Sequence, residues 1–393
     1  MPKCYPWRFN LRLWKFRKVS QQTDEHEEKA NSDSSKCSAL PDDICRRFSL
    51  SEIKAATHNF NPNLIIGAGF GYVYRATIDD GNNGTKAVAV KRYEDGFLSE
   101  NVTKFFRNEV IRLCQLRHPN LVTLVGFCDE QNEMIVVYEF MSGGTLSGHL
   151  YGYVHLSWKQ RLEICIGAAR GLHYLHTGAK YPLFHGHIKS LNILLDENLT
   201  PKLSGFAFSK MGNRGNSKAS LVRQDSRVLG TYGYMAPEYE SSLEVTEKSE
   251  VYSFGIILFE VLFGRRAFDA TLPENEQLIL DWASEYIRKG TVYQIIDPYL
   301  KGRIAPESFK KYLEIACSCV CYDRNERPAM GEVEVTLELA LELQQEANRP
   351  ELDGIYHPGE FMYGELSFSI PNAYFDLLRR HFDGHRQNIL LGW

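Results

Sequence analysis

Short runs of apolar residues broken by turn residues dominate the first part of the chain. Residues 64–91 alternate apolar and polar positions around a Gly-Asn-Asn-Gly turn at 81–84, which predicts two paired strands. Residues 101–116 repeat apolar positions at helical spacing and predict an amphipathic helix. Two further strands are expected near 121–127 and 134–140. This part is therefore predicted to be a sheet with one principal helix.

Beyond residue 141 the apolar spacing becomes mostly helical. Long helices are predicted over residues 158–176, 246–263 and 305–322. A β-rich part of roughly 90 residues thus precedes a helix-rich part of roughly 200, which is the size range of one large two-lobed unit.

Ordered structure is expected to begin at Phe48. Ser49 and Glu52 have the spacing of a capping box, and Phe48 and Ile53 that of a hydrophobic staple. A short helix to about Thr57 should follow.

The composition narrows the class of protein without naming it. The 393 residues are 44% hydrophobic and 24% charged, as in globular proteins. The net charge of −4 gives no argument for nucleic-acid binding. Nine irregularly spaced cysteines make a disulfide-stapled secreted scaffold a poor interpretation. No stretch reaches the ~18 apolar residues that span a bilayer.

The near-zero net charge conceals two oppositely charged segments. Residues 1–20 carry six lysines and arginines, no acid and several large apolar side chains. This basic aromatic arm suits an anionic membrane surface, with Cys4 available for palmitoylation, or else is a disordered basic arm. Residues 21–47 form an acidic linker that is expected to be disordered. A fusion of residues 1–20 to a fluorescent protein would distinguish the two interpretations of the arm.

Five motifs occur in a fixed order and carry the functional interpretation. A glycine-rich turn at 67–71 precedes a strand that ends in Lys91, and Glu109 follows in the predicted helix. Residues 185–192 read His-Gly-His-Ile-Lys-Ser-Leu-Asn, and Ala-Pro-Glu occupies 236–238. Glycines at Gly67, Gly69 and Gly71 would let backbone N–H groups approach phosphates. Each motif is modest alone, but chance does not produce all five in order.

The chain resembles a protein kinase from about Phe48 to Gln345. Within that family it is similar to plant receptor-like kinases of the FERONIA and Pto type, through residues 48–57, 121–134, 161–172 and 247–255 and through Arg327-Pro328. The resemblance implies an α+β, bilobal kinase-like fold over 48–345, with a β-rich N-lobe (48–141) and a helical C-lobe (142–345). An aromatic-rich tail, 346–393, would follow and dock on the C-lobe or on a partner. With no spanning segment, the layout predicts a cytoplasmic receptor-like kinase, at the inner face of the plasma membrane if the arm binds lipid.

The resemblance also assigns site residues by position. Gly67, Gly69, Gly71, Val73, Lys91 and Glu109 match the nucleotide-binding set, while Lys189 and Asn192 match the catalytic loop. Pairing of Lys91 with Glu109 could equally be a purely structural ion pair. Arg327 matches a late C-lobe arginine of the family.

Two departures from the family pattern affect the chemistry directly. His187 stands where the family has its base aspartate, and loss of general base catalysis typically costs ~10²–10⁴-fold. Gly205 stands where the family has its metal-binding aspartate, so only the neutral amide of Asn192 is left for Mg²⁺. Weak or absent ATP binding and little Mg²⁺ binding are therefore expected.

Smaller departures point the same way. The glycine-rich turn is one residue short, because its third glycine falls at 71 rather than 72. Gly186 replaces the arginine that would read a phosphorylated activation loop, and Glu250 replaces an aspartate that braces the catalytic loop. The serine-rich segment 211–227 would be a phosphorylation target or simply disordered.

Three hypotheses remain open from the sequence. The first is a pseudokinase that acts as a scaffold or allosteric partner of receptor kinases or their substrates. The second is an active Ser/Thr kinase with an atypical site, using His187 as base. The third is a passive adaptor with no nucleotide role. Cys317, Cys319 and Cys321 are predicted to pack in the core rather than bind zinc, because they alternate along a helix.

Overall fold

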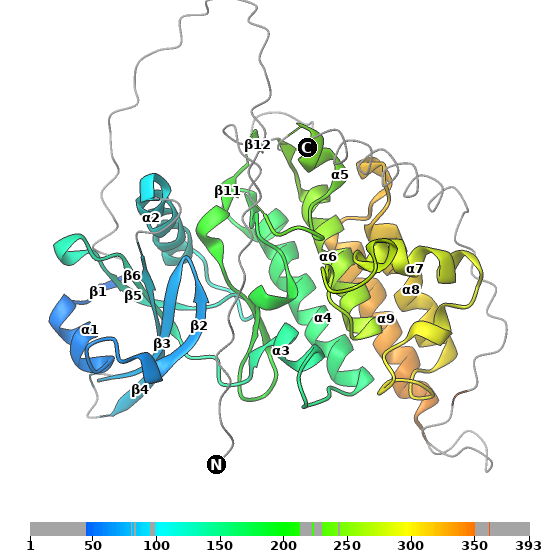
Figure 1. The fold of residues 1–393 in the computed structure, drawn as a ribbon, viewed down its shortest axis with the longest axis horizontal. Coiled ribbons are helices and arrows are strands. Elements are labelled where there is room, and N and C mark those ends of the chain that lie inside the picture. Colours follow the sequence, from blue (N-terminus) through cyan, green and yellow to red (C-terminus); the bar gives the residue numbers. More distant parts are fainter. Residues whose placement is uncertain are drawn as a thin grey trace, which may run out of the picture.

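The structure is a computed structural model that describes residues 45–79, 81, 84–94, 99–212, 222–223, 230–242, 244–349 and 361. A β-rich lobe and a larger helical lobe lie side by side, joined near residue 141 (Figure 1). The two-lobed kinase-like fold predicted from the sequence is confirmed. The arm 1–20, Cys4, most of the linker and nearly all of the tail lie outside the described residues.

The smaller lobe is built on one sheet with the strand order β1-β5-β6-β4-β3-β2. Its strands pair antiparallel except β1, which lies parallel to β5. The elements of this lobe are β1 (Arg46–Arg47), α1 (Leu50–Ala56), β2 (Ile65–Gly69), β3 (Gly71–Asp79), β4 (Thr85–Tyr93), α2 (Ser99–Gln115), β5 (Leu124–Cys128) and β6 (Ile135–Glu139).

The alternation of side chains along the strands divides the core into two. Val88 and Val90 of β4 pack with Ile53 of α1 on one face of the sheet. On the other face, Val136 of β6 packs with Val110 of α2. Because side chains alternate across a strand, Lys91 is placed on the α2 face. The α1 helix begins with the predicted capping box of Ser49 and Glu52.

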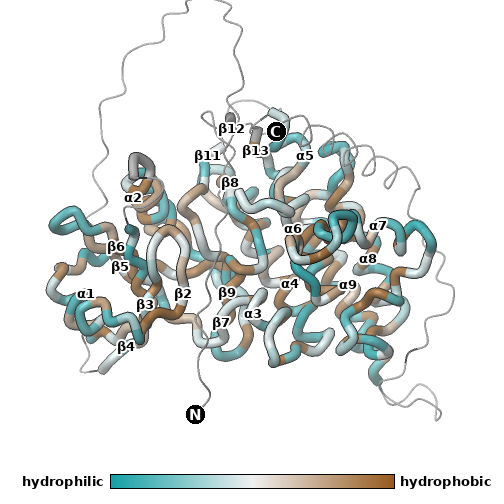
Figure 2. Tube along the Cα trace, viewed as in Figure 1, coloured by the Kyte–Doolittle hydropathy of each residue, from teal (hydrophilic) through white to brown (hydrophobic). Residues whose placement is uncertain are grey.

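The larger lobe is organised around α6 (Glu247–Phe263), whose residues are buried almost all round. Thr246 caps its N-terminus, and Gly264 ends it in a left-handed conformation, φ 61°. Apolar residues accordingly run through the inside of this lobe (Figure 2). The other helices are α3 (Leu146–Leu150), α4 (Trp158–His173), α5 (Pro237–Ser242), α7 (Ile279–Arg288), α8 (Pro306–Cys319) and α9 (Met330–Ala347).

The larger lobe also contains short strands. They are β7 (Gly144–Thr145), β8 (Leu183–Phe184), β9 (Ile193–Leu195), β10 (Pro201–Leu203), β11 (Lys210–Met211), β12 (Val222–Arg223) and β13 (Glu244–Val245). The strands β9 and β10 form a hairpin that holds the residues before and after it at fixed distances.

Two helix ends differ from the prediction. The helix expected over 158–176 ends as an α-helix at His173 and continues as one π-helical turn, Tyr174–Gly178. The helix expected to reach residue 322 ends at Cys319. Cys317, Cys319 and Cys321 are all buried, and no group of three or more His, Cys, Asp or Glu side chains that could hold a metal occurs within the described ranges. No helix there is long and apolar enough to cross a bilayer.

Candidate functional site

An ion pair joins the sheet to α2 on the side that faces the larger lobe. Lys91 Nζ lies 2.8 Å from Glu109 Oε2, and the Glu109 side chain is 1% exposed. Tyr93 also donates its hydroxyl proton to Glu109. Burial alone would raise the pKa of Glu109, but the charge and hydrogen bond of Lys91 outweigh it, so the pKa is lowered. Glu109 is therefore ionised and holds α2 against the sheet.

The glycine-rich turn joins β2 to β3. Gly69 pairs with Gly71 across the turn, and Val73 pairs with Lys91 on β4. Gly71 has φ 137°, and a Cβ there would lie 1.9 Å from the Arg92 carbonyl oxygen. Only glycine fits this position without a shift of the backbone. The turn therefore lies beside the end of β4, the strand that carries Lys91.

An aromatic cluster lies next to this turn. The ring of Phe70, at the tip of the turn, lies 5.4 Å from Phe105 of α2 and 5.3 Å from Phe208. Phe208 lies 5.0 Å from Phe105 and 5.0 Å from His187 of the catalytic loop, between ring centroids. The cluster of Phe70, Phe105, Phe208 and His187 thus links the glycine-rich turn, α2 and both catalytic segments. The sequence analysis did not single out Phe70, Phe105 or Phe208, since no local spacing brings them together.

Helix α6 supports the loop 185–192 through Glu250. Glu250 Oε1 accepts a hydrogen bond from the Gly186 N–H at 2.6 Å, and Glu250 Oε2 lies 2.8 Å from His176 Nε2. The glutamate therefore supports the loop although an aspartate was expected there. Gly186 has φ 74°, and a Cβ there would lie 2.7 Å from the Phe208 carbonyl oxygen. An arginine at this position would need a different path for the 3-10 turn Phe206–Phe208.

His187 lies in the loop 185–192, with its ring beside Thr231. Its Nε2 is 3.0 Å from Thr231 Oγ1, to which Lys189 Nζ donates at 3.0 Å. Burial, and then the charges of Lys189, His185 and Lys91, hold the pKa of His187 well below its usual 6.5. Burial also lowers the pKa of Lys189 to about 8. His187 is thus a neutral and weakly basic imidazole at neutral pH.

Gly205, which the resemblance places where kinases have a metal-binding aspartate, offers no carboxylate. Gly205 has φ 85°, and a Cβ there would lie 2.9 Å from Asn192 Nδ2. Asn192 Nδ2 donates to the His187 carbonyl at 2.7 Å. The family implies Mg²⁺, which prefers several hard oxygen ligands. A single amide oxygen does not supply them, so the residues present do not fit the metal.

The Ala-Pro-Glu motif forms a buried ion pair with Arg327. Arg327 Nη1 and Nη2 lie 2.7 and 2.8 Å from the two carboxylate oxygens of Glu238. This bidentate pair joins the Ala-Pro-Glu segment to the chain after α8. A disulfide joins Cys45 to Cys114, and no local pattern in the sequence predicts it, because the two cysteines are 69 residues apart.

The two-lobed fold, the Lys91–Glu109 pair and the loop at 185–192 together define a protein of the kinase class. Residues 63–337 match the family described as "Protein tyrosine and serine/threonine kinase", and the chain belongs to that family. It is of the plant receptor-like kinase type, because its relatives are FERONIA- and ANXUR-type receptor-like kinases.

Three similar proteins, all from Arabidopsis thaliana, show the extent of this relationship. The chain is 49% identical to the receptor-like protein kinase FERONIA over 323 residues, which cover 81% of this chain and 35% of that protein. It is 49% identical to ANXUR2 over 78% of this chain and 35% of that protein, and 43% identical to HERK 1 over 83% and 40%. The chain therefore spans about a third of the length of the curated relatives that it matches.

Proposed function

We propose that this chain is a receptor-like kinase domain with impaired phosphotransfer, which acts as a signalling scaffold or allosteric partner of receptor kinases. One observation carries the proposal: His187 and Gly205 stand at the two positions where phosphoryl transfer uses carboxylates. The proposed domain spans 48–345, divided into lobes at residue 141. The arm 1–20 would bring it to an anionic membrane surface.

The environment of His187 supports the loss of base catalysis. An efficient general base has a pKa near the working pH, whereas that of His187 is held well below 6.5. Its Nε2 is also within hydrogen-bonding distance of Thr231 Oγ1 rather than open to a substrate hydroxyl. A hydroxyl placed here would therefore gain little from proton removal.

The surroundings of Lys91 support weak nucleotide binding. Besides its pairing with Glu109, Lys91 donates to the hydroxyl of Tyr93 at 3.0 Å, a contact with which a phosphate would have to compete. The ring of Phe70 lies folded against Phe105 and Phe208 under the glycine-rich turn. Phosphates would have to displace this aromatic contact, and no carboxylate at Gly205 would hold their metal.

The test is phosphotransfer by the purified full chain. Transfer of labelled phosphate from ATP to the chain itself and to a generic basic protein should not exceed that of the Lys91→Met variant. Incorporation that is lost in Lys91→Met would overturn the proposal. The combined change His187→Asp and Gly205→Asp should raise transfer above this background, provided that the side chain of Asn192 moves aside.

The scaffold role needs a separate measurement. A receptor kinase of the FERONIA type would be assayed for autophosphorylation with and without this chain. A change in rate that persists with Lys91→Met would support an allosteric role that needs no catalysis. An unchanged rate, together with no complex in analytical ultracentrifugation, would contradict the role even if the chain is inactive.

An active kinase with an atypical site is the second candidate. The intact Lys91–Glu109 pair favours it, because phosphoryl transfer in kinases requires this lysine and this helix glutamate to be paired. Thermal shift with ATP, with and without Mg²⁺, separates the candidates. Stabilisation that requires Mg²⁺ favours the active kinase, whereas no stabilisation in either condition favours the passive adaptor.

A further inference from the structure

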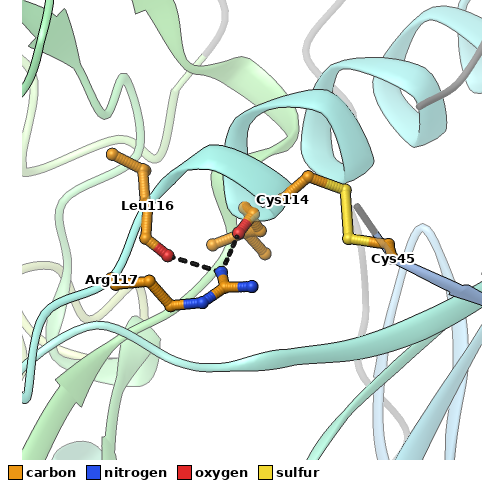
Figure 3. Close-up of a disulfide and its surroundings, with 5 residues drawn as sticks. Cys45, Cys114, Leu116 and Arg117 are labelled. Atoms are coloured by element: carbon orange, nitrogen blue, oxygen red, sulfur yellow. Dashed lines mark hydrogen bonds between the residues drawn. A yellow bond between two sulfur atoms is a disulfide. The ribbon is translucent and has the colours of Figure 1, made fainter. Parts of the chain in front are cut away.

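A disulfide joins the segment that leads into the kinase domain to helix α2. Cys45 immediately precedes β1, and Cys114 lies in the last turn of α2 (Figure 3). Their Cα atoms are 6.1 Å apart, a separation that a disulfide spans without backbone movement. The bridge crosses 69 residues and connects two elements that are otherwise held by different contacts.

The contacts of β1 place Cys45 without help from the bridge. Arg46 and Arg47 pair with Gly126 and Phe127 of β5, and the Phe48 N–H donates to the Phe127 carbonyl at 2.8 Å. The guanidinium of Arg47 also lies 2.6 Å from Asp129. These interactions hold Cys45 beside α2 whether or not the sulfurs are bonded. The two thiols are therefore at high effective concentration, which favours closure of the bridge.

The other end of the bridge lies on the helix that carries Glu109. Cys114 follows Glu109 by five residues, about 7.5 Å along a helix axis. The guanidinium of Arg117 caps this end of α2 by donating to the carbonyls of Leu113, at 3.0 Å, and Leu116, at 2.7 Å (Figure 3). A second anchor at Cys114 resists any displacement of α2 that would separate Glu109 from Lys91.

We propose that Cys45 and Cys114 are a reversible redox modification site that fixes α2 to the segment preceding the domain. The oxidant is a low-molecular-weight disulfide. The partly exposed Cys45 attacks it as a thiolate and forms a mixed disulfide, which releases one small thiol. The thiolate of the buried Cys114 then attacks the sulfur of Cys45 and releases the second. Two protein thiols give up two electrons and two protons, which leave with the two small thiols.

The remaining described cysteines, Cys128, Cys165, Cys317, Cys319 and Cys321, are all buried, so none offers an oxidant a partly exposed sulfur like that of Cys45. Burial also raises the pKa of the thiols of Cys128, Cys165, Cys317 and Cys319. Cys128 lies in β5 of the same lobe and is therefore a matched control. The inference goes beyond the proposed function, because bridge formation does not depend on whether the chain transfers phosphate.

The test uses the full chain in glutathione buffers of increasing oxidised fraction. Alkylation and peptide mass spectrometry should show a Cys45–Cys114 cross-link that dithiothreitol removes and reoxidation restores. Hydrogen exchange of the amides in 99–115 should slow by about tenfold or more on oxidation. This slowing should persist in Cys128→Ser and disappear in Cys45→Ser and in Cys114→Ala.

Each other outcome overturns the inference. If either cysteine pairs with Cys37, or if no cross-link forms, Cys45 and Cys114 are not a redox site. If the cross-link forms but hydrogen exchange in 99–115 is unchanged, the bridge does not fix α2. Reduced wild-type chain serves as the comparison that needs no substitution, in case Cys114→Ala fails to fold.

Discussion

Replacing Arg327 by methionine should destabilise the larger lobe strongly. The Arg327 side chain is fully buried, and that of Glu238 is 16% exposed. Arg327 also donates to the carbonyls of Cys321, Lys248 and Tyr322 at 2.7–3.2 Å. Methionine keeps the unbranched apolar stem of the side chain but leaves the carboxylate and these carbonyls without their donor.

The magnitude follows from burial. Removing one partner of a buried pair costs about 3–5 kcal/mol. A folded unit of roughly 300 residues unfolds with an entropy of about 0.6 kcal/mol/K, so Tm should fall by about 5–8 °C. Differential scanning calorimetry of the full chain measures this shift.

A matched substitution separates burial from loss of charge. Arg170→Met removes an arginine from ion pairs with Glu334 and Glu338, where the Arg170 side chain is 49% exposed. Exposed pairs contribute about 0–1 kcal/mol each, so with two pairs lost Tm should fall by no more than about 3 °C. If Arg327→Met lowers Tm no more than Arg170→Met does, the account of the buried pair is wrong.

The pair should also be sensitive to acid. Burial raises the pKa of Glu238, but the hydrogen bond and charge of Arg327 outweigh burial and leave the pKa below 4.5. The contribution of Glu238 is therefore complete above pH 4.5 and is lost as the pH falls through the lowered value. The difference in Tm between wild type and Arg327→Met should shrink over that interval, and a constant difference would contradict this assignment.

Two further changes test the smaller lobe and the catalytic loop. Gly71→Ala should destabilise the chain by about 1–3 kcal/mol, because Gly71 has φ 137° and an added Cβ would collide with the Arg92 carbonyl oxygen. Gly69→Ala is the control and should be nearly neutral in thermal unfolding, because no atom lies within 4 Å of a Cβ added there. Equal effects of the two substitutions would refute the steric argument. His187 should stay neutral in an NMR titration at pH 6, because its pKa is held well below 6.5. The lowered pKa also makes the free energy of unfolding fall as the pH drops below 6.5, since only the unfolded chain takes up the proton there. His187→Asn should flatten this decline, and an unchanged slope would show that other groups cause it.

Local patterns were sufficient for much of the fold. The capping box at Ser49 and the alternation along β4 depend on neighbours in sequence, and the structure shows both. The buried helix α6 likewise follows from its apolar run and its capping residue Thr246. The motif order was sufficient for the kinase family as well.

The sequence by itself determined which residues stand at the site, including His187 and Gly205. Only the tertiary structure decided which groups surround these two residues. Glu250 still reaches the Gly186 N–H, and Phe70 and Phe208 meet above the catalytic loop. These contacts, like the bridge from Cys45, join segments tens of residues apart, and no periodicity encodes such distances. A long-range contact depends on how the packed lobes place each backbone, whereas a helix cap or strand face depends on the few residues beside it.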